Sequence, residues 1–308
     1  MSVLSVKNLS KKYGFVQALD NVSFEVPKGS IFGILGPNGS GKTTLLGIVM
    51  DIVKASSGTF LWNGEPGSSE QRKKMGTLLE TPNFYHYLSG EKNLKIAAAI
   101  KEKGKEDIPG VLQKVNLFQR KDSKFSTYSL GMKQRLAIAS TLLGNPDVLV
   151  FDEPTNGLDP AGIAEIRELM KELNREGKTI IMASHILDEV EKVCTHVAII
   201  QKGVLKTVGT VEEVLAGNTD NTSTSVTTEI EIAAENSTQL ESILSAMPGI
   251  AGIENHGATI LIKSNGDITT SSINEFCFQK GIVLSHLLLK KKSLEKRFLE
   301  ITGTKSDR

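Results

Sequence analysis

The stretch that decides the fold is Gly36-Pro37-Asn38-Gly39-Ser40-Gly41-Lys42-Thr43-Thr44. The apolar run Ile31–Leu35 leads directly into it, and Thr43–Met50 continues as a predicted helix. A strand, a glycine-rich loop and a helix in this order form the context in which such a loop binds phosphate groups. A chance glycine turn before a helix is the alternative, but the three glycines, the lysine and the threonine are all present. We therefore interpret the stretch as a phosphate-binding loop.

A bound triphosphate explains why these residue types stand at these positions. Glycines let the backbone turn tightly and point its N–H groups at the phosphates, and the start of the following helix adds positive potential. Lys42 adds a point charge, and unit charges about 4 Å apart interact by about 4 kcal/mol at an effective dielectric of about 20. We expect the Thr43 hydroxyl to bind Mg²⁺ and the Thr44 hydroxyl to bind the α-phosphate. The expected nucleotide-binding residues of the loop are Gly36, Asn38, Gly39, Ser40, Gly41, Lys42, Thr43 and Thr44.

Two carboxylates follow a second buried strand. The apolar run Val148–Phe151 ends in Asp152 and Glu153. We expect Asp152 to hold Mg²⁺, directly or through water, and Glu153 to accept a proton from the attacking water. Alone, an apolar strand that ends in two acids is mostly structural. Together with the phosphate-binding loop, it predicts nucleotide hydrolysis.

Strand-like and helical segments alternate along the first part of the chain. Helices are expected near Ala161–Glu176 and through a polar stretch at about 88–140. Such alternation predicts an α/β fold with a mostly parallel sheet and helices on its faces. Together with the phosphate-binding loop, this fold is of the P-loop NTPase type, and the helix-rich stretch would form a helical subdomain. We place this nucleotide-binding domain at residues 1–217. Its predicted strands are Val3–Val6, Val22–Val26, Ile31–Leu35, Val148–Asp152, Thr179–Ala183 and His196–Gln201.

The composition changes after residue 217. Residues 218–227 are small and polar, which predicts a linker. Beyond the linker, residues 228–304 read as strand, helix, hairpin, helix and strand, followed by a last helix. This order predicts a small α+β domain of the ferredoxin-like type. The predicted segments are Glu229–Ile232, Thr238–Met247, Ile250–Ile253, Thr259–Ile262, Ser272–Gln279, Ile282–Leu287 and Ser293–Ile301.

Length, charge and cysteine content limit the class of protein. A chain of 308 residues is long enough for two domains. The net charge of +1 gives no support for a nucleic-acid partner. Cys194 and Cys277 are far apart in sequence and match no metal motif. Since no run approaches the roughly 20 apolar residues that cross a bilayer, and no signal-peptide pattern opens the chain, a membrane process would require another chain.

A second motif distinguishes among nucleotide hydrolases. GTPases carry a guanine-binding Asn-Lys-x-Asp, which is absent here, whereas Tyr128-Ser129-Leu130-Gly131-Met132-Lys133-Gln134-Arg135-Leu136 precedes the acidic strand. At this point the chain resembles the ABC ATPases, whose signature reads LSGGQ and is followed by a helix. Ser129 and Gly131 match the positions that contact the γ-phosphate in that family, while Leu130 and Met132 depart from it. A serine–glycine helix cap is the structural alternative.

The resemblance implies roles for further residues. Asn156–Pro160 looks like the family's D-loop, with Asp159 at the nucleotide interface, and His185 looks like the residue that senses the γ-phosphate. Tyr13 matches the aromatic residue that stacks on adenine. A lone histidine after a strand is more often structural, and Tyr13 could be an ordinary surface tyrosine. The order of the landmarks along the chain favours the functional interpretation of both.

One position departs from the family pattern. Most members carry a glutamine that contacts both the metal and the transporter, and Glu80 stands at the corresponding place. A carboxylate can still bind Mg²⁺, but an ionised one cannot donate a hydrogen bond. With Ser129–Gln134, this residue makes the chain similar to the bacitracin-resistance and lantibiotic-immunity subgroup of exporter ATPases.

The family arrangement implies partners. The signature of one chain covers ATP held by another, so we expect a homodimer around two ATP. We also expect a separately encoded permease, contacted around Glu80, Phe84, Tyr85 and Tyr87, which places the chain in the cytoplasm on the inner face of the cell membrane. Core packing within the helical subdomain is the alternative interpretation of these aromatic residues. Two alternatives remain: a soluble ABC ATPase that acts on ribosomes or DNA, and a degenerate cassette that binds ATP as a switch. The chain lacks the tandem cassettes, coiled coil and zinc insertions of the first. Glu153 and His185 argue against the second.

Overall fold

The computed structural model describes residues 1–79, 84–217, 228–264, 268–290 and 293–303. They form two compact units, one of Met1–Val211 with the described residues from Ile301 onward, the other of Glu212–Glu300. The linker predicted at 218–227 lies outside the described residues. The predicted domain boundaries at 217 and 228 stay predictions. None of the described helices is long and apolar enough to span a membrane.

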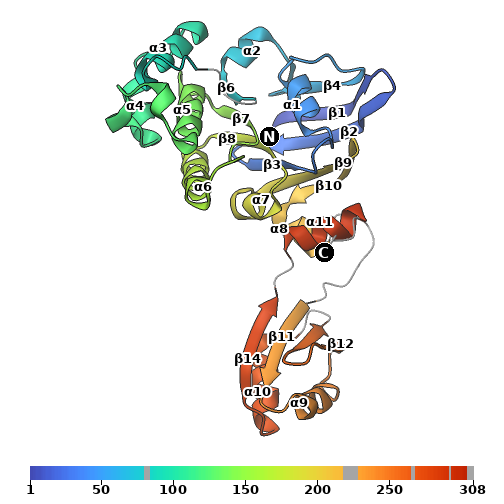
Figure 1. Cartoon of the computed structure of the whole chain (residues 1–308). Helices are drawn as coiled ribbons and strands as arrows, with labels where there is room; N and C mark the ends of the chain where they lie inside the picture. The colour runs from blue at the N-terminus through green and yellow to red at the C-terminus, as the bar shows by residue number, and fades with distance from the viewer. Residues whose placement is uncertain (80–83, 218–227, 265–267, 291–292, 304–308) are drawn as a thin grey trace. The chain divides into compact units, whose positions relative to one another are not determined.

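A six-stranded sheet forms the centre of the first unit (Figure 1), in the order β10-β9-β3-β8-β7-β6. The five strands from β9 to β6 are parallel, and β10 runs antiparallel at the edge. Every residue of β3 and β7 is buried, as expected for central strands covered on both faces. The mostly parallel sheet predicted from the sequence is therefore confirmed. Its strands are β3 (Ile31–Leu35), β6 (Met75–Leu78), β7 (Val148–Asp152), β8 (Thr179–Ser184), β9 (His196–Gln201) and β10 (Val204–Thr210).

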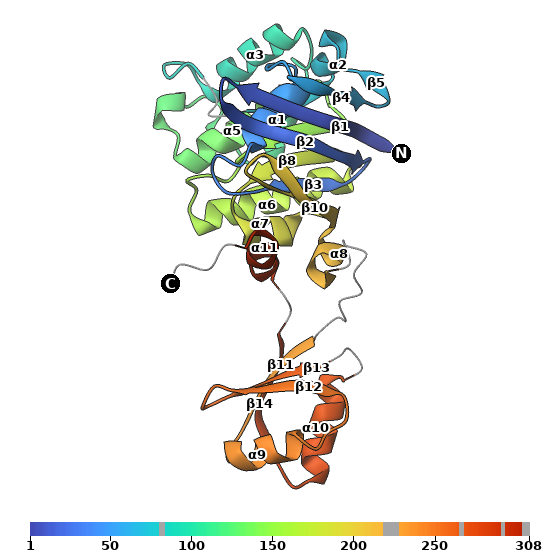
Figure 2. The same cartoon turned by 90° about the vertical axis from the view of Figure 1, so that its right-hand side faces the viewer.

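The first two predicted strands do not join this sheet. They form an antiparallel hairpin, β1 (Ser2–Tyr13) and β2 (Val16–Pro27), which continues with β4 (Ser57–Trp62) and β5 (Glu65–Pro66). Figure 2 shows β1 and β2 side by side. A two-residue turn in which Gly14 has φ +56° closes the hairpin and makes the antiparallel pairing possible. The sequence pattern identified the strands but not their separate sheet.

Helix α1 (Lys42–Val49) joins the two sheets. Leu45, Leu46 and Val49 lie in one apolar core with residues from both sheets. Trp62 of β4 is fully buried and donates its indole N–H to the carbonyl of Val49 at 2.8 Å. The helix that begins at the phosphate-binding loop is thus held from both sides.

The remaining helices of the first unit cover the sheet or form the predicted helical subdomain. The subdomain contains α3 (Gly90–Lys101), α4 (Ile108–Lys114) and α5 (Leu130–Leu142), together with two short 3₁₀ turns at Phe118–Arg120 and Phe125–Thr127. Ser89 and Ser129 cap α3 and α5. The other helices are α2 (Ser69–Lys73), α6 (Pro160–Arg175), α7 (Leu187–Val193) and α8 (Val211–Ala216), the last of which straddles the boundary of the two units.

The second unit contains an antiparallel sheet in the order β12-β13-β11-β14, with α9 and α10 packed on one face (Figure 2). In chain order its strands are numbered 1 to 4, so the sheet reads 4-1-3-2, which confirms the predicted ferredoxin-like topology. Alternate residues such as Ile230 and Ile232 face the helices and are fully buried. The elements are β11 (Thr228–Ala234), α9 (Ser237–Leu244), β12 (Ile250–Asn255), β13 (Ile260–Ser264), α10 (Thr270–Gln279) and β14 (Leu284–Lys290). The last helix, α11 (Leu294–Thr302), begins in this unit and ends in residues that belong to the first.

The packing of α7 on β3 leads to a stability prediction. A Cβ at Gly33 would lie 2.7 Å from Cγ1 of Val190 and 3.0 Å from Sγ of Cys194. Because these atoms belong to short buried side chains, Gly33→Ala should lower the free energy of unfolding by about 1–3 kcal/mol. Urea denaturation measures the loss. When Val190→Ala is added, the free energy of unfolding of the double variant should be higher than the value expected if the two single effects simply added.

Gly110 of α4 provides the control. Nothing lies within 4 Å of a Cβ built there. Gly110→Ala should therefore raise stability by about 0.5–1 kcal/mol through the higher helix propensity of alanine. Equal effects of the two alanine substitutions would contradict the proposed close packing at Gly33.

Candidate functional site

The phosphate-binding loop follows β3 and requires glycine at two positions for lack of space. A Cβ at Gly36 would lie 2.2 Å from the carbonyl oxygen of Ile200, and one at Gly41 would lie 2.6 Å from that of Ala18. Gly41 has φ +108° and Gly39 has φ +76°, backbone conformations that favour glycine. The loop is therefore closely fitted between neighbouring strands, and this fit shapes its backbone.

Lys42 lies inside this loop. The residue is 5% exposed, and its ammonium group donates to the carbonyl oxygens of Gly36 at 2.8 Å and Pro37 at 3.3 Å. The same nitrogen lies 3.6 Å from Oε1 of Glu153. The structure thus brings the predicted cation and the predicted base together, although 111 positions separate them in sequence.

Thr43 and Asp152, the two described residues that we expect to bind Mg²⁺, also lie in contact. The Thr43 hydroxyl donates to Oδ2 of Asp152 at 2.8 Å. Hydroxyl and carboxylate oxygens are suitable Mg²⁺ ligands, and Mg²⁺ in such sites is usually completed by phosphate oxygens and water. Across the described part of the chain, no group of three or more His, Cys, Asp or Glu could hold a metal by itself. The residues therefore fit Mg²⁺ that arrives with a nucleotide; Glu80, the third predicted ligand, lies outside the described residues.

Glu153 is positioned by three neighbours. Its N–H donates to the carbonyl of Ala183 at 3.0 Å, and its side chain lies between Lys42 and His185. Nδ1 of His185 is 2.8 Å from Oε2 of Glu153. The φ of Glu153 is +48°, an uncommon value for a non-glycine residue that is often found where function requires it. The parallel strands β7 and β8 bring both residues to the same edge of the sheet.

A hollow of about 470 Å³ opens at this edge, here called the nucleotide hollow. Residues at the start of β2 and Lys202 line it, and sequence reasoning missed them. No local sequence pattern marks Lys202. It reaches the hollow through a contact between distant segments, in which the neighbouring Gly203 N–H donates to the carbonyl of Ser40 at 2.9 Å. The lining residues are Val16, Gln17, Ala18, Asn38, Gly39, Ser40, Gly41, Lys42, Thr43, Thr44, Glu153 and Lys202.

Tyr13 does not line the nucleotide hollow. It ends β1, is 48% exposed, and carries the ammonium group of Lys11 4.7 Å from its ring centre. The stacking of adenine on Tyr13 stays a prediction.

A separate hollow of about 380 Å³ collects the signature and D-loop residues, here called the signature hollow. Ser129 accepts a hydrogen bond from the Met132 N–H and caps α5, while Asp159 accepts one from the Gly162 N–H and caps α6. The two hollows share no lining residue. Within one chain, therefore, Ser129, Gly131 and Asp159 come together, but not around the nucleotide hollow. The lining residues are Ser129, Leu130, Gly131, Arg135, Gly157, Leu158, Asp159, Ala161, Gly162 and Glu165.

Known proteins share these features. The family model described as "ABC transporter" matches residues 19–156. The uncharacterized ABC transporter ATP-binding protein YhcH of Bacillus subtilis is 38% identical over 98% of this chain and 96% of its own length. The lantibiotic transport ATP-binding protein SrtF of Streptococcus pyogenes is 39% identical over 65% of this chain and 88% of its own. The bacitracin transport ATP-binding protein BcrA of Enterococcus faecalis is 39% identical over 66% and 68%.

Solved structures agree with the sequence relatives. CbiO1 from Clostridium perfringens, part of an ABC transporter complex, has a TM-score of 0.64 and 31% identity over 70% of this chain and 92% of its own. A dimeric post-hydrolysis ATP-binding cassette bound to ADP and Pi has a TM-score of 0.60 and 25% identity over 68% and 98%. The chain therefore belongs to the ABC transporter family, as an ATP-binding and ATP-hydrolysing subunit related to the lantibiotic and bacitracin transport proteins.

Proposed function

We propose that this chain drives a membrane exporter, pairing with a second copy around two ATP molecules and acting on a separately encoded permease at the inner face of the cell membrane. The observation that carries the proposal is the separation of the nucleotide hollow from the signature hollow within one chain. Two copies related by a twofold axis would bring each signature hollow to the other chain's nucleotide. The dimeric relative bound to ADP and Pi supports this arrangement.

Each residue of the site has a role in the proposed cycle. The loop and Lys42 bind the β- and γ-phosphates, and Thr43 with Asp152 would hold Mg²⁺, which supplies charge neutralisation on the phosphate oxygens. Glu153 accepts a proton from the attacking water, while His185 orients its carboxylate from 2.8 Å. Ser129 and the start of α5 in the second chain contact the γ-phosphate. Loss of this phosphate removes their contact, and the dimer opens.

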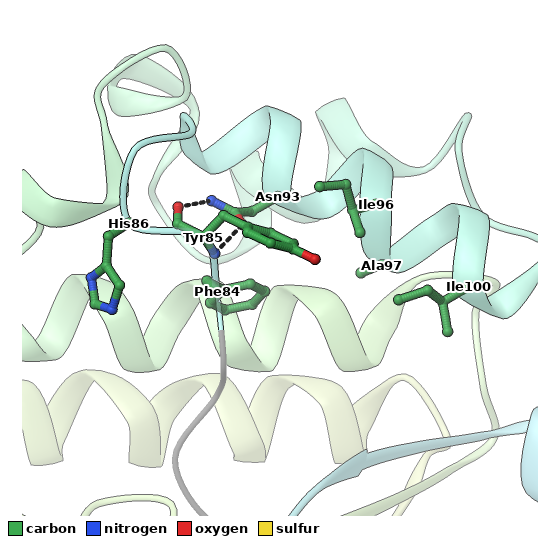
Figure 3. A pocket seen from close by; sticks show the side chains of 7 residues that line it. All are labelled: Phe84, Tyr85, His86, Asn93, Ile96, Ala97 and Ile100. Carbon is green, nitrogen blue, oxygen red and sulfur yellow. Dashed lines mark hydrogen bonds between the residues drawn. The ribbon is translucent and has the colours of Figure 1, made fainter.

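A groove in the helical subdomain is the proposed place where the permease docks. Figure 3 shows Tyr85 and Asn93 at this groove. The Asn93 side-chain amide accepts a hydrogen bond from the Tyr85 N–H at 2.8 Å and donates one to the Tyr85 carbonyl at 3.1 Å. Ile100 at the end of the groove is 79% exposed, and the neighbouring Tyr87 is also exposed. Exposed aromatic and aliphatic side chains around a hollow of about 410 Å³ are typical of protein contact sites. The lining residues are Phe84, Tyr85, His86, Asn93, Ile96, Ala97 and Ile100.

The named relatives favour a peptide antibiotic as the class of compound that the proposed exporter transports. SrtF and BcrA are named for lantibiotic and bacitracin transport. The soluble alternative, action on ribosomes or DNA, has no support from these relatives or from the net charge of +1.

Replacing the proposed base tests hydrolysis and pairing together. Glu153→Gln should keep ATP binding but lower phosphate release by at least about 100-fold, because an amide cannot accept the proton. The variant should also accumulate as an ATP-bound dimer, measured by size-exclusion chromatography with and without ATP. Glu168→Gln, on the exposed face of α6, is the matched control. Phosphate release at the control's rate would exclude Glu153 as the base.

A charge placed in the groove tests the permease contact. Ile100→Asp should leave the ATPase activity of the isolated chain within about twofold, since surface substitutions have small effects, but should prevent co-purification of a polytopic partner from membranes. Ala99→Asp, at the exposed neighbouring position of α3 outside the groove, should retain the partner. Recovery of ribosomes or DNA instead of a membrane protein would favour the soluble alternative.

A further inference from the structure

Glu189 is a buried acidic residue with no role in the cycle described above. It lies on α7 and is 4% exposed. Its Oε2 accepts a hydrogen bond from the hydroxyl of Thr155, itself 2% exposed. Its Oε1 is buried without a hydrogen-bond partner among the described residues. Burying a carboxyl group costs free energy that one hydrogen bond recovers only in part, so this contact calls for a reason beyond stability.

The Thr155–Glu189 contact connects two short segments of the chain. One segment carries Glu153, and the other carries His185. Thr155 stands two residues after Glu153, and Glu189 stands four residues after His185. The same segments also meet through the Glu153 N–H on the Ala183 carbonyl and through His185 on the Glu153 carboxylate. Of these three contacts, only the Thr155–Glu189 pair joins two buried side chains.

The segment that contains Thr155 continues into the signature hollow. The Thr155 carbonyl accepts from the Leu158 N–H at 3.2 Å, and Leu158 and Asp159 line that hollow. Asp159 then caps α6 through the Gly162 N–H. The buried Thr155–Glu189 hydrogen bond therefore holds a segment that begins at the nucleotide hollow, with Glu153, and ends in the signature hollow, with Leu158 and Asp159.

We propose that Glu189 is a positioning residue which, through Thr155, fixes the segment from Glu153 to Asp159 relative to His185. The bond holds the Glu153 carboxylate in line for water activation. It also transmits the state of the nucleotide hollow to Leu158 and Asp159. The first part concerns the ATPase reaction of the chain itself, and the second part rests on the proposed pairing of two copies.

Paired substitutions separate positioning from stability. Thr155→Val leaves the Glu189 carboxyl buried without its donor, so it should lower both the melting temperature and kcat. Adding Glu189→Met removes both polar partners and keeps the shape, a change that can be nearly neutral for stability. The double variant should regain its melting temperature, yet its kcat should stay about 10- to 100-fold below wild type, the size of loss that a misplacement of about 1 Å produces. The KM for ATP should change little, since the phosphate-binding loop is untouched.

Conservative variants and a matched threonine complete the test. Thr155→Ser and Glu189→Gln each keep the hydrogen bond and should retain kcat within about threefold of wild type, a change of about 0.6 kcal/mol in the activation free energy. Thr179→Val removes a buried hydroxyl that accepts from the Gly29 N–H at the opposite end of β8, and should lower stability without lowering kcat. A double variant that regains kcat with its melting temperature, or a Thr179→Val variant with an equal kcat loss, would overturn the proposal.

A second measurement keeps this proposal distinct from the pairing of two copies. ATP-dependent dimerisation of Glu153→Gln alone reports on pairing, and kcat of the Thr155 and Glu189 variants reports on positioning. If pairing holds, Thr155→Val/Glu189→Met in the Glu153→Gln background should need more ATP to dimerise. An unchanged ATP requirement would remove the transmission to Leu158 and Asp159 from the proposal.

Discussion

A triphosphate can be bound only where several backbone N–H groups converge without side chains in the way, and the rest of the structure depends on this constraint. At Gly36 and Gly41 the limit is set by carbonyl oxygens of Ile200 and Ala18, which leave no room for a Cβ. These oxygens come from β9 and β2, so both sheets shape the loop. Because helix α1 is buried between the sheets, its N-terminus stays directed at the phosphate-binding loop.

The positions of the proposed hydrolytic groups follow from the order of the parallel strands. Because β3, β8 and β7 are neighbours and parallel, their carboxyl ends meet at one edge. That edge receives the loop from β3, His185 after β8, and Asp152 with Glu153 at the end of β7. The Thr43–Asp152 bond and the Lys42–Glu153 ion pair close the arrangement. Ligands of open α/β sheets bind at this edge for the same reason.

One chain holds the nucleotide hollow and the signature hollow apart. Ser129 and Asp159 cap helices and line a hollow of their own, so the interpretation of Ser129 as a helix cap is confirmed. A capping residue at a helix start leaves further N–H groups directed outward, which suits a phosphate presented by another molecule. The capping role of Ser129 is therefore compatible with its proposed contact to the γ-phosphate of a second chain.

The sequence by itself determined the elements whose identity is local. The strands Ile31–Leu35, Val148–Asp152 and His196–Gln201 were predicted at their observed bounds, because continuous apolar runs of that length occur in buried parallel strands. The phosphate-binding loop, its lysine and the two carboxylates were likewise predicted from the sequence, because each group lies within one turn or at the end of one strand. The ferredoxin-like order of the second unit followed from alternation and hairpin signals.

Only the tertiary structure decided what depends on contacts between distant segments. The separate sheet of β1, β2 and β4, the lining by Val16 and Lys202, and the Thr155–Glu189 bond have no local signature. Glu189 occupies an ordinary position on a short helix, and its importance comes from a hydroxyl 34 residues away. The physical reason is that local patterns record backbone propensity and burial, whereas the partner of a buried polar group is set by which segments the sheet order brings together.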